Sequence, residues 1–218
     1  MSNQNNKRSR LRVWLFVVFV NVIGAMAMLF VMETAQLKSG IATEMEEAEL
    51  RLSDNDWANI QHHAFLRYDN WFVSSGVEDV LTTMFIPKPT KSAIQLNRMI
   101  PEKYNYRFVN NVKYTFLQAS YRVEMLQYWV WLMSPIIVAL LLTGYYRWKM
   151  KAFTLKGGST IVTKLVLRSF FFSTLLIVVF TVTPNFLAAY SFYIPPAMLL
   201  LMAWAVSHVI SAFHKDFG

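Results

Sequence analysis

Cysteine is absent from the 218-residue sequence. Its absence excludes a disulfide framework, a thiol nucleophile and any zinc or iron–sulfur site with cysteine ligands. Charged residues are also scarce, at 16% of the chain, whereas a typical soluble domain has roughly 25%. Apolar residues reach 55% and the mean hydropathy is positive. These values favour a small membrane protein over a soluble domain.

Acidic residues are missing from most of the chain, because twelve of the thirteen lie between Glu33 and Glu124. Four apolar runs with almost no charge lie outside that stretch, at residues 13–32, 128–146, 165–184 and 193–213. A helix of about 20 residues rises about 30 Å, the thickness of the hydrocarbon core of a bilayer. The sequence therefore predicts an all-α polytopic protein with four transmembrane helices.

The first apolar run has two interpretations, because basic residues precede it as they would in a signal peptide. A cleaved signal peptide has an apolar region of about 7–15 residues that ends at a small-x-small cleavage site. The run at 13–32 is longer, and Met32-Glu33-Thr34 offers no such site. We expect an uncleaved signal anchor.

Basic residues set the expected orientation. The N-terminus and the loop at 147–164 carry Lys and Arg but no acid, and the loop contains Arg147, Lys149, Lys151 and Lys156. Segments of this kind lie in the cytoplasm by the positive-inside rule. Membrane topology therefore explains the net charge of +8 better than nucleic-acid binding does. Both termini are then cytoplasmic in a bacterial inner membrane, and residues 33–127 are periplasmic if the host is Gram-negative.

The expected organisation follows in chain order. It comprises a basic cytoplasmic N-terminus (1–12), a first span (13–32), a helical periplasmic domain (33–127), a second span (128–146), a basic cytoplasmic loop (147–164), a third span (165–184), a short periplasmic turn (185–192), a fourth span (193–213) and a cytoplasmic C-terminus (214–218).

Residues 33–127 have helical patterns. Ser53 with Asp54 and Asp56 predicts an N-cap and an acidic first turn. Residues spaced three, four or seven apart predict one apolar packing face: Trp57, Ile60, Ala64, Tyr68, Phe65 and Phe72. A last helix, at about 104–127, is expected to continue into the second span and to kink near Pro135.

An acidic group at 44–49 has two interpretations. The simpler one is a solvated helix face formed by Glu44, Glu46, Glu47, Glu49 and Arg51. The alternative is a docking surface for a basic partner outside the membrane.

Residues that carry chemistry do not form a catalytic or metal-binding pattern. His62 and His63 are adjacent, so on a helix their side chains point about 100° apart, whereas a helical metal site needs i, i+4 spacing. No acid lies well inside any predicted span, and Gly157-Gly158-Ser159-Thr160 lacks the flanking residues of a phosphate loop. His208 is expected to contact headgroups at a helix end, with a proton pathway as the alternative. We expect no enzyme activity, cofactor or metal.

Small residues within the predicted spans are candidates for helix packing. Gly24 and Ala25 in the first span, and Ala203 and Ser207 in the fourth, would permit close approach of a partner helix. We expect these positions to be exposed for a partner, and the basic loop to contribute orientation more than recognition.

The C-terminal half resembles a family of small inner-membrane proteins encoded by integrating conjugative elements and related plasmids. The similar residues span about 104–217 and include the following motifs: Leu117-Gln118-Ala119-Ser120-Tyr121, Pro135, the stretch from Gly144 to Phe153, Ile194-Pro195-Pro196 and the tail Ala212-Phe213-His214-Lys215. Where that family has an aspartate-glycine pair before the basic loop, this chain has Thr143-Gly144.

The resemblance implies an accessory component of conjugative type IV secretion, encoded near the coupling ATPase. The expected partners are membrane lipids and other membrane proteins, with the coupling ATPase and secretion-channel proteins as candidates; direct nucleic-acid binding is not expected. An oligomeric pore or transporter subunit is the alternative. A membrane sensor is a weaker one, because the roughly twenty residues between the second and third spans are too few for a signalling module.

Overall fold

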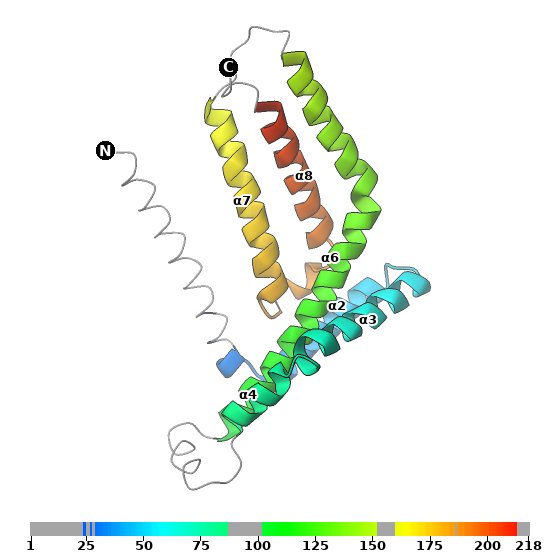
Figure 1. Cartoon of the computed structure of the whole chain (residues 1–218). Coiled ribbons are helices and arrows are strands. Elements are labelled where there is room, and N and C mark those ends of the chain that lie inside the picture. Colours follow the sequence, from blue (N-terminus) through cyan, green and yellow to red (C-terminus); the bar gives the residue numbers. More distant parts are fainter. Residues whose placement is uncertain are drawn as a thin grey trace, which may run out of the picture. The chain divides into compact units, whose positions relative to one another are not determined.

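The computed structural model describes residues 24, 27, 29–86, 102–151, 160–185 and 187–212 (Figure 1). Most of the predicted first span, and Lys156 in the basic loop, lie outside the described residues. The described residues form helices and turns and contain no strand, which confirms the prediction of an all-α chain. The helices are α2 (Thr34–Glu49), α3 (Asp54–Tyr68), the π-helix η1 (Asp69–Val73), α4 (Val77–Phe85), α6 (Glu102–Lys151), α7 (Thr160–Val182), the 3₁₀-helix η2 (Ala188–Tyr190) and α8 (Ile194–Ala212).

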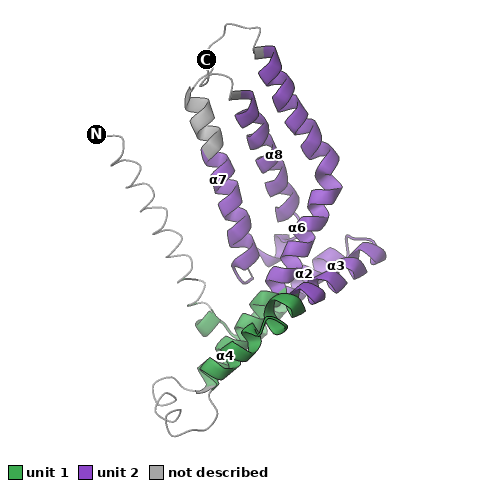
Figure 2. Ribbon diagram, viewed as in Figure 1, with its two compact units in different colours: residues 1–40, 68–117 green, residues 41–67, 118–218 purple. Residues whose placement is uncertain are grey.

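The chain divides into two compact units (Figure 2). Unit 1 contains Met1–Gly40 and Tyr68–Leu117, and unit 2 contains Ile41–Arg67 and Gln118–Gly218. Helices α2 and α6 each begin in unit 1 and end in unit 2.

Helix α3 begins where the sequence predicts. The Ser53 hydroxyl accepts a hydrogen bond from the Asp56 backbone N–H at 3.2 Å and donates one to the Asp56 carboxylate at 2.8 Å. Asp54 and Asp56 occupy the first turn, where negative charge is favourable near the positive end of the helix dipole.

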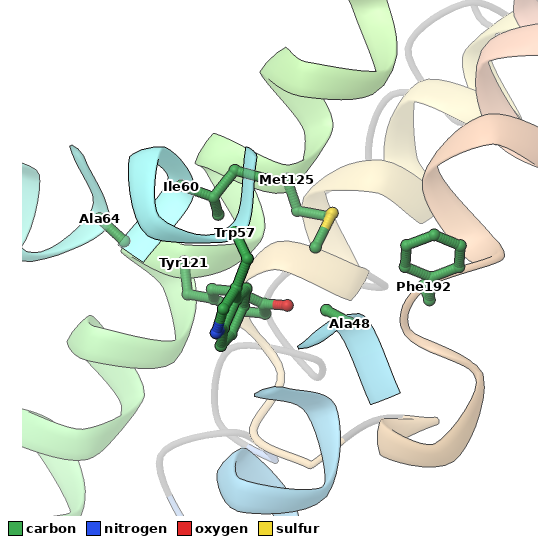
Figure 3. Close-up of a cluster of buried hydrophobic side chains, with 7 residues drawn as sticks. All are labelled: Ala48, Trp57, Ile60, Ala64, Tyr121, Met125 and Phe192. Carbon is green, nitrogen blue, oxygen red and sulfur yellow. The ribbon is translucent and has the colours of Figure 1, made fainter. Parts of the chain in front are cut away.

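The buried face of α3 forms most of the core of unit 2. Trp57, Ile60 and Ala64 are buried as predicted. The rings of Trp57 and Tyr121 of α6 pack edge to face, with their centroids 6.1 Å apart. Figure 3 shows the complete cluster, which adds Ala48, Met125 and Phe192 to these residues. Three helices and the segment before α8 therefore share one apolar core.

Phe65 and Phe72 do not share a face. Phe65 is 53% exposed, whereas Phe72 is buried in the core of unit 1 with Leu29, Phe108 and Val112. The prediction for Phe65 is wrong, because Phe65 directly follows Ala64 and on α3 points about 100° away from the buried face. Phe72 follows the change from α-helix to the π-helix η1 at Asp69. A π-turn holds more residues than an α-turn, so seven residues no longer correspond to two turns.

Helix α6 contains 50 residues and continues through Pro135 without a break. This confirms the prediction that the helix beginning near residue 104 continues into the second apolar run. Figure 1 shows the ribbon of α6 changing direction within its C-terminal half, which contains Pro135.

Helices α7 and α8 form the predicted hairpin and pack along each other (Figure 1). Helix α7 ends at Val182, two residues before Pro184, and Pro195 lies in the first turn of α8. Asn185 and Leu187 adopt positive φ angles of 52° and 54° in the connection, which reverses the chain within a few residues.

The helices of unit 2 expose apolar surface. Helices α6 and α8 are each long and apolar enough to cross a membrane, and α7 has a shorter apolar stretch at Arg168–Val182. Only 11% of the most apolar window of α6 is buried, so most of this apolar surface is exposed. Its exposed side chains include Trp131, Ile136, Val138 and Leu142.

The closest approach between helices in unit 2 involves Gly144 of α6 and Ser207 of α8. A Cβ atom added at Gly144 would lie 2.8 Å from the Ser207 Cα. Real Cβ atoms do not approach a backbone this closely, so α6 and α8 pack at this distance only because residue 144 has no side chain. Ala203 lies one turn before Ser207 on α8 and is also buried.

We predict that Gly144→Ala destabilises the chain by about 1–3 kcal/mol, since the added methyl group forces α8 away from α6. Chemical denaturation of the purified chain in mild detergent measures this change. Gly24→Ala is the matched control, because a Cβ atom at Gly24 meets no atom within 4 Å. Equal stability of the two variants would contradict the proposed close packing.

Candidate functional site

Arg122 is the most polar side chain in the interior of unit 2, where it is only 1% exposed. It projects from α6, and its Nε donates to Glu44 Oε2 of α2 at 3.0 Å. Its Nη2 donates to the other carboxylate oxygen of Glu44. The pair is therefore bidentate, the strongest geometry available to an arginine and a carboxylate.

Arg122 also binds the C-terminal end of α7. Its Nη1 donates to the carbonyl oxygens of Phe180 and Thr183, the latter at 2.8 Å. The guanidinium carbon lies 4.5 Å from the centroid of the Phe180 ring. The last carbonyls of a helix lack intrahelical donors and carry the negative end of the helix dipole. A guanidinium group at this position donates hydrogen bonds to those carbonyls, and its positive charge is favourable beside the negative end of the dipole.

Gln118, one turn before Arg122 on α6, completes the network. Its amide nitrogen donates to Glu44 Oε1 at 2.7 Å, and its carbonyl oxygen accepts from the Asn185 backbone N–H at 3.3 Å. Asn185 is the residue with positive φ that follows α7. Two side chains of α6, each bound to Glu44 of α2, thus hold the end of α7 and the turn that follows it.

The structure corrects the prediction for Glu44. The sequence placed Glu44 on a solvated face, but Glu44 is completely buried. Glu46 and Glu49 are exposed, and Glu47 forms a partly exposed ion pair with Arg51. Glu44 faces inward because it lies three and four residues from the buried Ile41 and Ala48, on the same side of α2.

Burial raises the pKa of the Glu44 carboxyl, and the hydrogen bonds and positive charge of Arg122 oppose that rise. The carboxylate and the guanidinium therefore depend on each other. Removal of either one would leave the other charged and buried without its partner.

Asn111 has a corresponding role in unit 1. Asn111 is completely buried in α6, and its amide nitrogen donates to the carbonyl oxygens of Leu29 and Met32, both at 2.8 Å. Its carbonyl oxygen accepts from the Thr34 hydroxyl at 2.8 Å. Helix α6 thus supplies the donors for two carbonyls of the segment directly before α2.

The predicted packing residues lie in different environments. Ala203 and Ser207 are buried within the chain, so the expectation that they are exposed for a partner is wrong. The physical reason is that α6 already packs on this side of α8 through Gly144. Gly24 is exposed, and Ala25 lies outside the described residues.

The predicted basic residues lie at the C-terminal end of α6. Arg147 and Lys149 are exposed, the backbone of Lys151 ends α6, and Lys156 lies outside the described residues. His62 and His63 are both exposed on α3. Within the described residues no group of three or more His, Asp or Glu side chains is arranged to hold a metal ion.

Sequence patterns did not identify Arg122, Gln118 or Asn111. One signal was present: Gln118 and Arg122 are four residues apart, directly before an apolar run, so they share a helix face that also includes the buried Met125. Polar residues on a face that is otherwise apolar indicate an internal partner, but the sequence does not show which carboxylate supplies it.

Comparison with known proteins assigns the chain to a family. Residues 33–214 match the model of the family described as IncC plasmid conjugative DNA transfer protein DtrJ-like. The chain belongs to this DtrJ-like family. The match includes Glu44 and the segment before α6 as well as the C-terminal half, where the resemblance to conjugation proteins was noted. No curated protein and no solved structure matches the chain.

We predict that Glu44→Gln and Arg122→Gln each destabilise this DtrJ-like protein by roughly 3–5 kcal/mol, because each leaves one buried charge uncompensated. The double variant should cost less than the sum of the two, by about 1–3 kcal/mol. Denaturation in mild detergent measures all three. Glu47→Gln, in the partly exposed pair with Arg51, is the control and should cost about 1 kcal/mol or less. Strict additivity of the Glu44 and Arg122 changes would show that the two do not depend on each other.

Proposed function

We propose that this DtrJ-like protein is a non-enzymatic, four-span inner-membrane accessory component of conjugative DNA transfer. In this proposal its spans and its periplasmic helices pack against other membrane proteins of the transfer apparatus, with the coupling ATPase and the type IV secretion channel as candidates. The observation that supports it best is the family match over residues 33–214, combined with exposed apolar surface on α6, α7 and α8.

Exposed apolar surface of this kind needs a non-aqueous environment. Soluble monomers rarely expose large contiguous apolar patches. The large exposed side chains lie on all three helices, for example Trp131 on α6, Phe171 and Phe172 on α7, and Trp204 on α8. A bilayer would cover these surfaces and would also explain why the helices carry so little charge.

The polar contacts of α6 support a topology in which the first span and α7 both end on the side of the membrane that holds residues 33–127. If the first span and α7 both run from the cytoplasm outward, then both end at the periplasmic surface. Asn111 and Arg122 bind the carbonyls at those two helix ends, each within its own unit. Both belong to the part of α6 before residue 128, which the proposal places outside the membrane.

The topology predicts that a cysteine introduced at Lys156 is protected from an impermeant thiol reagent applied to intact cells, whereas one at exposed His62 is labelled. The chain has no native cysteine, so each label reports a single position. Labelling at position 156 without permeabilisation would contradict the orientation and leave the family assignment unaffected.

A partner contact remains available at two kinds of surface. Gly24 is exposed, with no atom near the position of its missing side chain, so a partner helix can approach closely there. The large apolar side chains of α6 and α7 offer a second, broader surface. Ala203 and Ser207 are excluded because they are buried within the chain.

We predict that Gly24→Leu lowers recovery of transfer-apparatus proteins in affinity purification from mild detergent, and lowers conjugation frequency, while unfolding as the wild type does. Ala42→Leu, at an exposed position of α2, is the control. If neither a coupling ATPase nor a channel protein co-purifies with the wild type, and deletion leaves DNA transfer unchanged, the proposed role in conjugation is wrong.

A further inference from the structure

Acidic residues are missing from most of the C-terminal half of the chain. Residues 125–215 include seven Lys and Arg residues and no Asp or Glu. The nearest acid before this stretch is Glu124, whose carboxylate accepts a hydrogen bond from Arg67 at 2.6 Å. The exposed Arg147 and Lys149 therefore have no acid close to them in the sequence.

The surroundings of these two cations are apolar and aromatic. Tyr146 and Met150 are 58% and 62% exposed and alternate with Arg147 and Lys149 on the last turns of α6. Tyr145 is exposed as well, and its ring lies 5.5 Å from that of Trp148. The same helix exposes Val138 and Leu142 one to two turns earlier, so the apolar surface continues up to the cations.

This combination distinguishes two classes of anionic partner. Nucleic acid would need cations that project into water, away from surface covered by lipid. A phospholipid places its phosphate beside its own acyl chains, and Tyr, Trp and Arg side chains are favourable at that boundary. Exposed cations that adjoin a continuous apolar helix face therefore fit a lipid headgroup better than a nucleic-acid backbone.

We propose that the end of α6 formed by Tyr146, Arg147, Lys149 and Met150 binds the headgroups of anionic phospholipids. This inference rests on the proposed membrane location, and adds a lipid preference to it. Arg147 and Lys149 are two residues apart and point to nearly opposite sides of the helix, so each binds the phosphate of its own lipid. The tyrosine ring and methionine side chain contact the glycerol and upper acyl region.

The test is titration of the purified full-length chain in neutral detergent with phosphatidylglycerol, followed by native mass spectrometry. Arg147→Gln and Lys149→Gln should each weaken binding at one of the two lipid positions about five-fold, and the double variant should weaken it at both, as expected for removal of cations near a membrane surface. Lys103→Gln is the matched control, because Lys103 is an exposed cation at the opposite end of α6. It should change the affinity less than two-fold.

Four outcomes would overturn the lipid proposal. One is equal binding of phosphatidylglycerol and phosphatidylcholine to the wild type, and another is an equal loss in the Lys103→Gln control. The third is that the double variant keeps lipid binding but loses binding to a DNA duplex, which would assign the cations to nucleic acid. Competition by glycerol phosphate as strong as that by the lipid would assign the site to free phosphate. A chain that inserts normally but lacks lipid preference contradicts this inference alone, whereas a chain absent from membranes contradicts the proposed function.

Discussion

A guanidinium group buried in a protein interior is stable only where anionic and carbonyl oxygens surround it, and this requirement determines much of unit 2. Arg122 obtains those oxygens from Glu44 on α2 and from Phe180 and Thr183 at the end of α7. Both elements must therefore stay beside α6. The apolar core around Trp57 and Tyr121 contributes more buried area, but apolar contacts tolerate sliding, whereas a bidentate pair with two carbonyl contacts accepts one geometry.

Local signals in the sequence were sufficient to predict most of the helices. The Ser53 cap, the spacing of Trp57, Ile60 and Ala64, and the proline residues around the α7–α8 turn each act over a few residues, so the sequence specifies them directly. Phe65 and Phe72 were predicted to share a face, but a π-turn that begins between them interrupts the helical period, and a single sequence does not reveal where such a turn occurs. The Glu44–Arg122 pair joins residues 78 apart in the chain, and no local pattern encodes that pairing.

The sequence also does not show which small residues pack within the chain. Gly24, Ala203 and Ser207 have the same signature in the sequence, since each permits a close approach between helices. The structure separates them, because α6 already occupies the space beside Ser207 through Gly144, whereas among the described residues no atom lies within 4 Å of a Cβ atom built at Gly24. Whether a small residue serves the chain's own packing or is free for a partner depends on a helix about sixty residues away, so the distinction required the tertiary structure.

The position of the polar network has a consequence for how a conjugation protein of this kind would respond to a partner. Glu44 belongs to α2, whose opposite side exposes Glu46 and Glu49, while Arg122 holds the end of α7. A partner that displaced α2 would separate Glu44 from Arg122 and leave the guanidinium bound only to the carbonyls of α7. Because such a separation exposes an unpaired charge, α2 and the α7–α8 hairpin are expected to move together. The same interaction that stabilises unit 2 would thus make binding at the helices outside the proposed membrane region affect the hairpin within it.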